Sequence, residues 1–138
     1  MKGLAAVLIE LKKPLVLEEI EIPKLNFGQV LIDLLCSGIC GSQLGEIDGV
    51  KGEDKYLPHL LGHEGSGIVV DCGEGVTTVK EGDKVVLHWR KGAGIQSLPP
   101  VYHSKSLGTV NAGWVTTFNE YAVVSENRVT PVPGDLDP

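Results

Sequence analysis

Residues 62–67 have the sequence GHEGSG, and residues 37–42 have the sequence SGICGS. Gly73 and Val76 follow the first stretch after short intervals. Each of the two stretches surrounds one chemically capable side chain, His63 or Cys40, with glycines that permit sharp turns and close backbone approach. These two segments are the most informative feature of the chain.

Thiolate, imidazole and carboxylate groups are the ligand types that zinc accepts, usually in a tetrahedral arrangement. Cys40 and His63 offer two of these groups, and they belong to different predicted elements separated by a loop. Such spacing favours a catalytic site held open between elements over a compact zinc finger. A single cysteine or histidine usually has a purely structural role. Metal binding is therefore predicted from the two segments together and not from either one alone.

Composition supports a mostly β architecture in a single domain of 138 residues. The 18 glycines and 8 prolines are spread along the chain, which indicates many short elements joined by turns. The formal charge of −6, without a lysine or arginine cluster, disfavours nucleic acid as a partner. No apolar run has the length of a membrane span, and three cysteines do not make a disulfide framework. We therefore expect no membrane partner and a cytoplasmic location.

A coarse assignment of elements follows from periodicity and turn signals. Strand character is predicted at residues 1–10, 15–22, 29–35, 60–71, 76–79, 83–87, 118–124 and 128–132. A short loop-to-helix stretch is predicted at 37–49, and residues 89–114 are predicted to form a long loop without regular structure. The tail 131–138 has the composition of a linker.

The segments at 37–42 and 62–67 together resemble the signature of zinc-dependent medium-chain alcohol dehydrogenases. Residues 82–86 (GDKVV) and 118–121 (FNEY) resemble two further segments of that family, in the same order. The resemblance spans nearly the whole chain. It implies a GroES-like, mostly β, partly open barrel with a few short helices over residues 1–138. It also implies that 131–138 begin an interdomain linker and that a nucleotide-binding domain would follow.

The resemblance assigns roles to individual residues. Cys40 and His63 would bind the catalytic zinc, and Glu64 would enter the coordination shell or stand just outside it. Ser42 matches the hydroxyl that hydrogen-bonds the substrate alcohol and passes on its proton, although it could also cap a helix that starts near Gln43. Zinc would act as a Lewis acid, and hydride would pass to or from NAD or NADP. The substrate would be a small alcohol or carbonyl compound, and the full-length protein could form a homo-oligomer.

Several positions depart from the family pattern. Gln43 stands where an aspartate usually orients the metal-binding histidine, and Gly45 stands where some members have the last histidine of a proton relay. The third firm zinc ligand of the family lies beyond residue 138. No cysteine occurs in residues 88–117, so a structural four-cysteine zinc site is excluded. The loop there must be ordered by packing, for which Trp89, Tyr102 and Trp114 are the candidates.

These observations predict the catalytic domain of an NAD(P)-linked alcohol dehydrogenase that binds zinc weakly or partially and has no turnover by itself. The chain has no Gly-x-Gly-x-x-Gly turn, so no cofactor-binding residue is predicted in it. One alternative is a zinc-free quinone or enoyl reductase, and another is a free-standing binding or assembly module. The remaining cysteines and histidines are expected to be core, turn, loop or surface residues: Cys36, Cys72, His59, His88 and His103.

Overall fold

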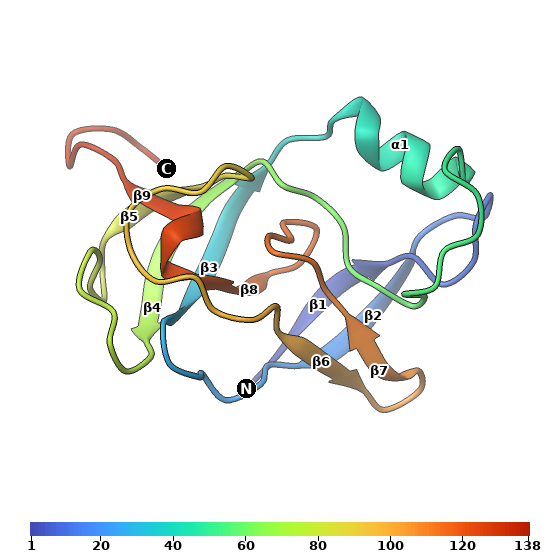
Figure 1. Ribbon diagram of the computed structural model, residues 1–138, viewed down its shortest axis with the longest axis horizontal. Coiled ribbons are helices and arrows are strands. Elements are labelled where there is room, and N and C mark those ends of the chain that lie inside the picture. Colours follow the sequence, from blue (N-terminus) through green and yellow to red (C-terminus); the bar gives the residue numbers. More distant parts are fainter.

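The computed structural model describes residues 1–138, and most of its regular structure is β-strand (Figure 1). The strands are β1 (Lys2–Val7), β2 (Val16–Glu21), β3 (Gln29–Ser37), β4 (Gly65–Cys72), β5 (Lys84–Leu87), β6 (Val101–Ser104), β7 (Gly108–Asn111), β8 (Tyr121–Ser125) and β9 (Val129–Pro131). The helices are α1 (Gly41–Asp48) and the single 3₁₀ turn η1 (Glu126–Arg128).

The strands form two antiparallel sheets with the orders β1-β2-β6-β7 and β8-β3-β4-β5-β9. The segment that precedes β8 joins the sheets, because the N–H of Glu120 donates to the carbonyl of Leu4 and its own carbonyl accepts the N–H of Leu34. Figure 1 shows the two sheets curling around a shared interior, with α1 beyond the end of β3. The predicted mostly β, partly open barrel with short helices is confirmed.

The core consists of two apolar clusters that meet at β3. Val30 and Ile32 belong to the cluster of the five-stranded sheet, whereas Leu31 belongs to the cluster that contains β1, β2, β6 and β7. Both faces of the first half of β3 are therefore buried, and each buried aliphatic side chain contributes roughly 1.5–3 kcal/mol. The second half differs from the buried strand predicted at 29–35, because it leaves the core and exposes Leu35.

The prediction of an irregular loop at 89–114 was wrong in its second half, which contains the hairpin β6–β7. Each strand has only four residues, too few for an alternating pattern to stand out in the sequence. Tyr102 anchors the hairpin: its ring is buried and its hydroxyl accepts the N–H of Val123 at 2.8 Å. Burial raises the pKa of Tyr102 to about 12. The predicted strand at 76–79 is also absent.

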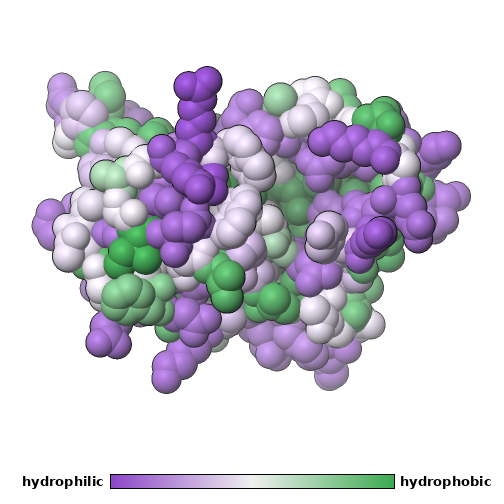
Figure 2. Space-filling view, viewed as in Figure 1, coloured by the Kyte–Doolittle hydropathy of each residue, from purple (hydrophilic) through white to green (hydrophobic).

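Polar residues dominate the face of the molecule shown in Figure 2, where hydrophobic residues are interspersed in small groups. No helix of the structure is both long enough and apolar enough to pass through a bilayer.

The buried carboxylate of Glu126 explains why 76–79 are not a strand. It accepts the backbone N–H groups of Thr77 and Thr78 and the hydroxyl of Thr78, and its other oxygen accepts the N–H of Ile95. Burial alone would raise the pKa of Glu126, but these hydrogen bonds to the ionised form outweigh it and lower the pKa from its ordinary value of 4.5. Glu126 thus ties two irregular segments to η1.

Glu126→Gln should lower the free energy of unfolding at neutral pH by about 1–3 kcal/mol, because an amide cannot accept all of these hydrogen bonds. A carboxylate with a lowered folded-state pKa contributes stability above its unfolded pKa and loses it as the pH falls below about 4.5. Urea unfolding should therefore show that the difference in unfolding free energy between the unsubstituted chain and Glu126→Gln becomes smaller in acid. A difference independent of pH would contradict this role for Glu126.

Candidate metal centre

The antiparallel pairing of β3 with β4 brings the two glycine-rich segments to the same end of the sheet. The pairing ends with Ser37 opposite Gly65. Cys40 lies three residues beyond the end of β3, and His63 lies two residues before the start of β4. The two side chains, 23 positions apart in the chain, consequently lie close together in the fold.

One ligand atom from each of Cys40, His63 and Glu64 lies within 4.8 Å of the other two. Nε2 of His63 is 3.8 Å from Oε1 of Glu64. A thiol, an imidazole and a carboxylate at this spacing match the donor types and the compactness of a zinc site. The structure brings together the three residues that the sequence selected, and they fit a metal ion of that kind.

Glycines hold the backbone of this site close to its side chains. The N–H of Gly38 donates to the carbonyl of Glu64 at 2.7 Å, and a Cβ atom at Gly38 would lie 2.4 Å from Oε2 of Glu64. Gly62, which precedes His63, has a φ of 95°, a conformation that disfavours other residues. The turn before β4 and the position of the Glu64 carboxylate therefore depend on these two glycines.

Helix α1 begins beside the site, with Cys40 as its N-cap residue. Ser42 lies inside the first turn, so the alternative in which Ser42 caps the helix was wrong. Hydrogen bonds from the Ser42 hydroxyl and the Ser42 N–H lower the pKa of the Cys40 thiol, against the opposing effects of burial and of the Glu64 charge. The helix start therefore favours the thiolate, the form of cysteine that binds metal.

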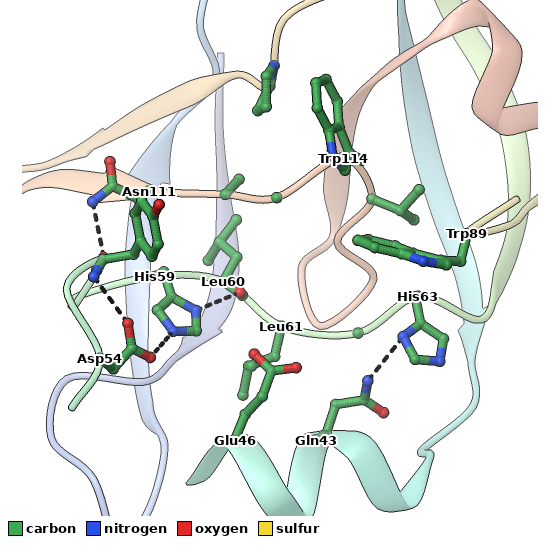
Figure 3. A pocket seen from close by; sticks show the side chains of 16 residues that line it. Gln43, Glu46, Asp54, His59, Leu60, Leu61, His63, Trp89, Asn111 and Trp114 are labelled. Atoms are coloured by element: carbon green, nitrogen blue, oxygen red, sulfur yellow. Dashed lines mark hydrogen bonds and ion pairs between the residues drawn. The ribbon is translucent and has the colours of Figure 1, made fainter. Parts of the chain in front are cut away.

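A pocket of about 410 Å³ opens next to His63 (Figure 3). Its apolar lining includes Leu61, Trp89 and Trp114, and Glu46 of α1 points into it from the side opposite the two tryptophans. A cavity of mixed apolar and polar lining adjoining a candidate metal site has the general form of a small-molecule site. Trp89, for which packing was the preferred expectation over lining a pocket, forms part of this wall.

The tryptophans of this wall pack on a buried arginine. The guanidinium of Arg128 lies 5.6 Å from the ring centroid of Trp89 and 5.4 Å from that of Trp114, and it donates to the carbonyl of Trp89. The Trp89 ring lies 6.2 Å from the His63 ring. Cation–π contacts of this kind contribute about 0.5–2 kcal/mol each, so Arg128 fixes the aromatic wall beside His63.

His59, expected to be an ordinary loop histidine, is buried in the same pocket. Its Nε2 lies 2.7 Å from Oδ2 of Asp54 and its Nδ1 lies 2.9 Å from the carbonyl of Leu60. Figure 3 shows the Asp54–His59 pair at the end of the pocket away from His63. No pattern in the sequence indicates this pair, because the two residues lie five positions apart in irregular chain.

The other cysteines and histidines lie outside the cluster. Cys36 was expected to be a core or turn residue, but it is exposed because the end of β3 leaves the core. Cys72 is half-buried, and burial raises the pKa of its thiol. His88 contacts the carbonyl of Arg90 and the hydroxyl of Thr130, as expected of a packing residue. His103 is exposed on β6.

Comparison with known proteins identifies the fold and the family. The fold is similar to that of an alcohol dehydrogenase zinc-binding domain protein from Burkholderia ambifaria, with a TM-score of 0.85 over 98% of this chain and 43% of the other, at 24% identity. That likeness defines the class of fold, a half-barrel domain. Residues 26–134 match the family model of the alcohol dehydrogenase GroES-like domain, and the chain belongs to this family.

Two relatives named alcohol dehydrogenase match almost the whole chain. The relative from Geobacillus stearothermophilus is 35% identical over 97% of this chain and 41% of its own length. The relative from Moraxella sp. is 34% identical over 96% of this chain and 40% of its own length. The chain thus spans about two fifths of the length of these relatives.

Gly38→Ala should weaken binding of Co²⁺ or Zn²⁺ by about 10-fold, the scale observed when groups that orient metal ligands are altered. The added Cβ would displace the Glu64 carboxylate, whose end can rotate away without unfolding the chain. Gly41→Ala is the matched control, because its Cβ would meet nothing within 4 Å. Metal titration of both variants measures the effect, and equal affinities would exclude a contribution of Glu64.

Proposed function

We propose that this chain is the metal-binding catalytic domain of a zinc-dependent, NAD(P)-linked alcohol dehydrogenase. The observation that carries the proposal is the cluster of Cys40, His63 and Glu64 ligand atoms within 4.8 Å beside a pocket of about 410 Å³. The names of the relatives support the reaction class, oxidation of an alcohol or reduction of a carbonyl compound. The enzyme as a whole is a proposal, since the relatives are more than twice as long.

In this proposal Cys40 and His63 hold the zinc ion, and Glu64 binds it directly or stands beside it. The ion, when bound, supplies Lewis-acid polarisation of the substrate oxygen. The helix start that lowers the pKa of Cys40 keeps the sulfur available as a thiolate. The pocket beside His63 would receive the carbon chain of the substrate, because its wall of tryptophan and leucine side chains is largely apolar.

Ser42 is proposed to bind the substrate hydroxyl and to hold its proton. Its Oγ accepts one hydrogen bond from Nε2 of Gln43 at 3.2 Å, and the residue is exposed to solvent. A hydroxyl oxygen has a second lone pair, which remains for a substrate O–H. The proton cannot continue to a side chain at position 45, because that residue is Gly45.

The complete enzyme is further proposed to act on a small alcohol or carbonyl compound in the cytoplasm and to form a homo-oligomer. The three cysteines are free thiols, which suits a reducing compartment. NAD or NADP would be bound outside residues 1–138, for which the family resemblance is the support.

Cys40→Ser should weaken Zn²⁺ binding by 10-fold or more, because an alcohol replaces the thiolate ligand. Cys36→Ser is the matched control, since Cys36 is exposed, lies only four residues earlier and is not part of the cluster. Competition with a chromophoric chelator gives the Zn²⁺ affinity, and the thiolate charge-transfer band of the Co²⁺ form reports the cysteine directly. Equal Zn²⁺ affinity of the two variants would show that Cys40 is not a zinc ligand.

The 138-residue chain, loaded with Zn²⁺, should show no reduction of NAD or NADP with a panel of primary, secondary and aromatic alcohols. The reason is that the chain offers no Gly-x-Gly-x-x-Gly turn to receive the pyrophosphate. Absorbance of the reduced nicotinamide is the measurement. Turnover that depends on Cys40 would contradict the proposal that this domain is inactive alone.

A further inference from the structure

Gln43 lies directly beneath the candidate metal centre and contacts both halves of it. It is the buried residue of α1, with a relative exposure of 1%. Its Oε1 accepts the N–H of Cys40 at 2.7 Å, and its Nε2 lies 3.2 Å from Oγ of Ser42 and 3.2 Å from Nδ1 of His63. Both N–H groups of the buried amide and one of the two lone pairs of its oxygen are engaged by these three neighbours.

The direction of the amide follows from the groups around it. The Cys40 N–H can only donate, so it requires the oxygen of Gln43, and the nitrogen must face His63. An amide nitrogen can only donate, so Nδ1 of His63 must be the acceptor. A neutral imidazole has one acceptor nitrogen and one N–H, and the His63 proton therefore resides on Nε2.

This tautomer is the wrong one for binding a metal ion through Nε2. Nε2 is the nitrogen that faces Glu64, at 3.8 Å from its Oε1, whereas Nδ1 faces Gln43. A histidine that binds metal through one ring nitrogen needs the proton on the other, where a hydrogen-bond acceptor normally fixes it. The Gln43 nitrogen cannot accept that proton.

We propose that Gln43 is a positioning residue whose amide must turn over when His63 binds a metal ion, so that the helix start and the histidine compete for one oxygen. The inference rests on the proposed metal site. With the amide turned, Oε1 accepts the Nδ1–H of His63, the N–H of Cys40 loses its acceptor, and the hydroxyl of Ser42 must donate to the amide instead of accepting from it. Metal binding is thereby coupled to the N-terminus of α1, which carries the Cys40 ligand.

A glutamate at this position would remove the competition, because it has nearly the same shape and two acceptor oxygens. One oxygen could keep the Cys40 N–H while the other accepted the Nδ1–H of His63. Gln43→Glu is therefore a sharp test. Leu44→Glu is its control: it adds the same charge at the next position of α1, on a side chain that is exposed and outside the hydrogen-bond network.

The first experiment uses the metal-free chain and needs no binding event. Long-range ¹H–¹⁵N correlation spectra distinguish the two imidazole tautomers, and His63→Gln identifies the resonances of His63 among the four histidines. We expect Nε2–H in the unsubstituted chain and a protonated Nδ1 in Gln43→Glu. An Nδ1–H tautomer in the unsubstituted chain would overturn the inference, whether or not either variant folds.

The second experiment measures Zn²⁺ affinity by chelator competition for the unsubstituted chain and both variants. Gln43→Glu should bind Zn²⁺ about 10–100-fold more tightly than Leu44→Glu, the scale typical of residues that orient metal ligands. Equal affinity of these two variants would overturn the role of Gln43 while leaving the metal site in place. Absence of Zn²⁺ binding in all three proteins would overturn the metal site and, with it, the role of Gln43 in metal binding.

Discussion

The pairing of β3 with β4 is the constraint on which the rest of the structure depends. The two strands approach so closely that a Cβ at Gly67 would lie 2.1 Å from the carbonyl oxygen of Asp33. β3 contributes to both apolar clusters and pairs with β8 on its other edge, so it cannot shift without disturbing the whole barrel. Because the strand ends are level at Ser37 and Gly65, the segments that carry Cys40 and His63 start from neighbouring points.

Buried polar groups hold the irregular segments that this pairing leaves free. Glu126 ties residues 77–78 and 95 to η1, and Gln43 ties the start of α1 to His63. Arg128 is buried without a carboxylate partner, and its guanidinium contacts the rings of Trp89 and Trp114. Buried polar groups are costly unless their hydrogen bonds are made, so the hydrogen bonds of Glu126 and Gln43 favour one arrangement of the segments that they join.

The proposed site combines the ligand types that the family resemblance implies with a glutamine as the supporting residue. A carboxylate beneath the proposed metal-binding histidine would accept its second N–H, whereas the amide of Gln43 is inferred to donate to the same atom. The same amide also completes the helix start that lowers the pKa of Cys40. One neutral side chain thus contacts both proposed ligands. In the proposal, the Cys40 N–H and the Nδ1–H of His63 require the same oxygen atom of Gln43.

The sequence by itself determined the family-level features: a mostly β half-barrel, and Cys40, His63 and Glu64 as neighbours. Glycines at sharp turns and ligand-type side chains at motif positions are local features of the chain. They can therefore be recognised from the sequence alone. The strands β6 and β7 could not be predicted from the sequence, because each has only four residues. Their order depends on Tyr102, which is buried and bonded to β8.

Only the tertiary structure decided how the polar groups pair. The Asp54–His59 contact, the carboxylate of Glu126 beneath residues 77–78 and the direction of the Gln43 amide all depend on atoms brought together across the barrel. Hydrogen bonds are short and directional, so their partners follow from three-dimensional position and not from spacing along the chain.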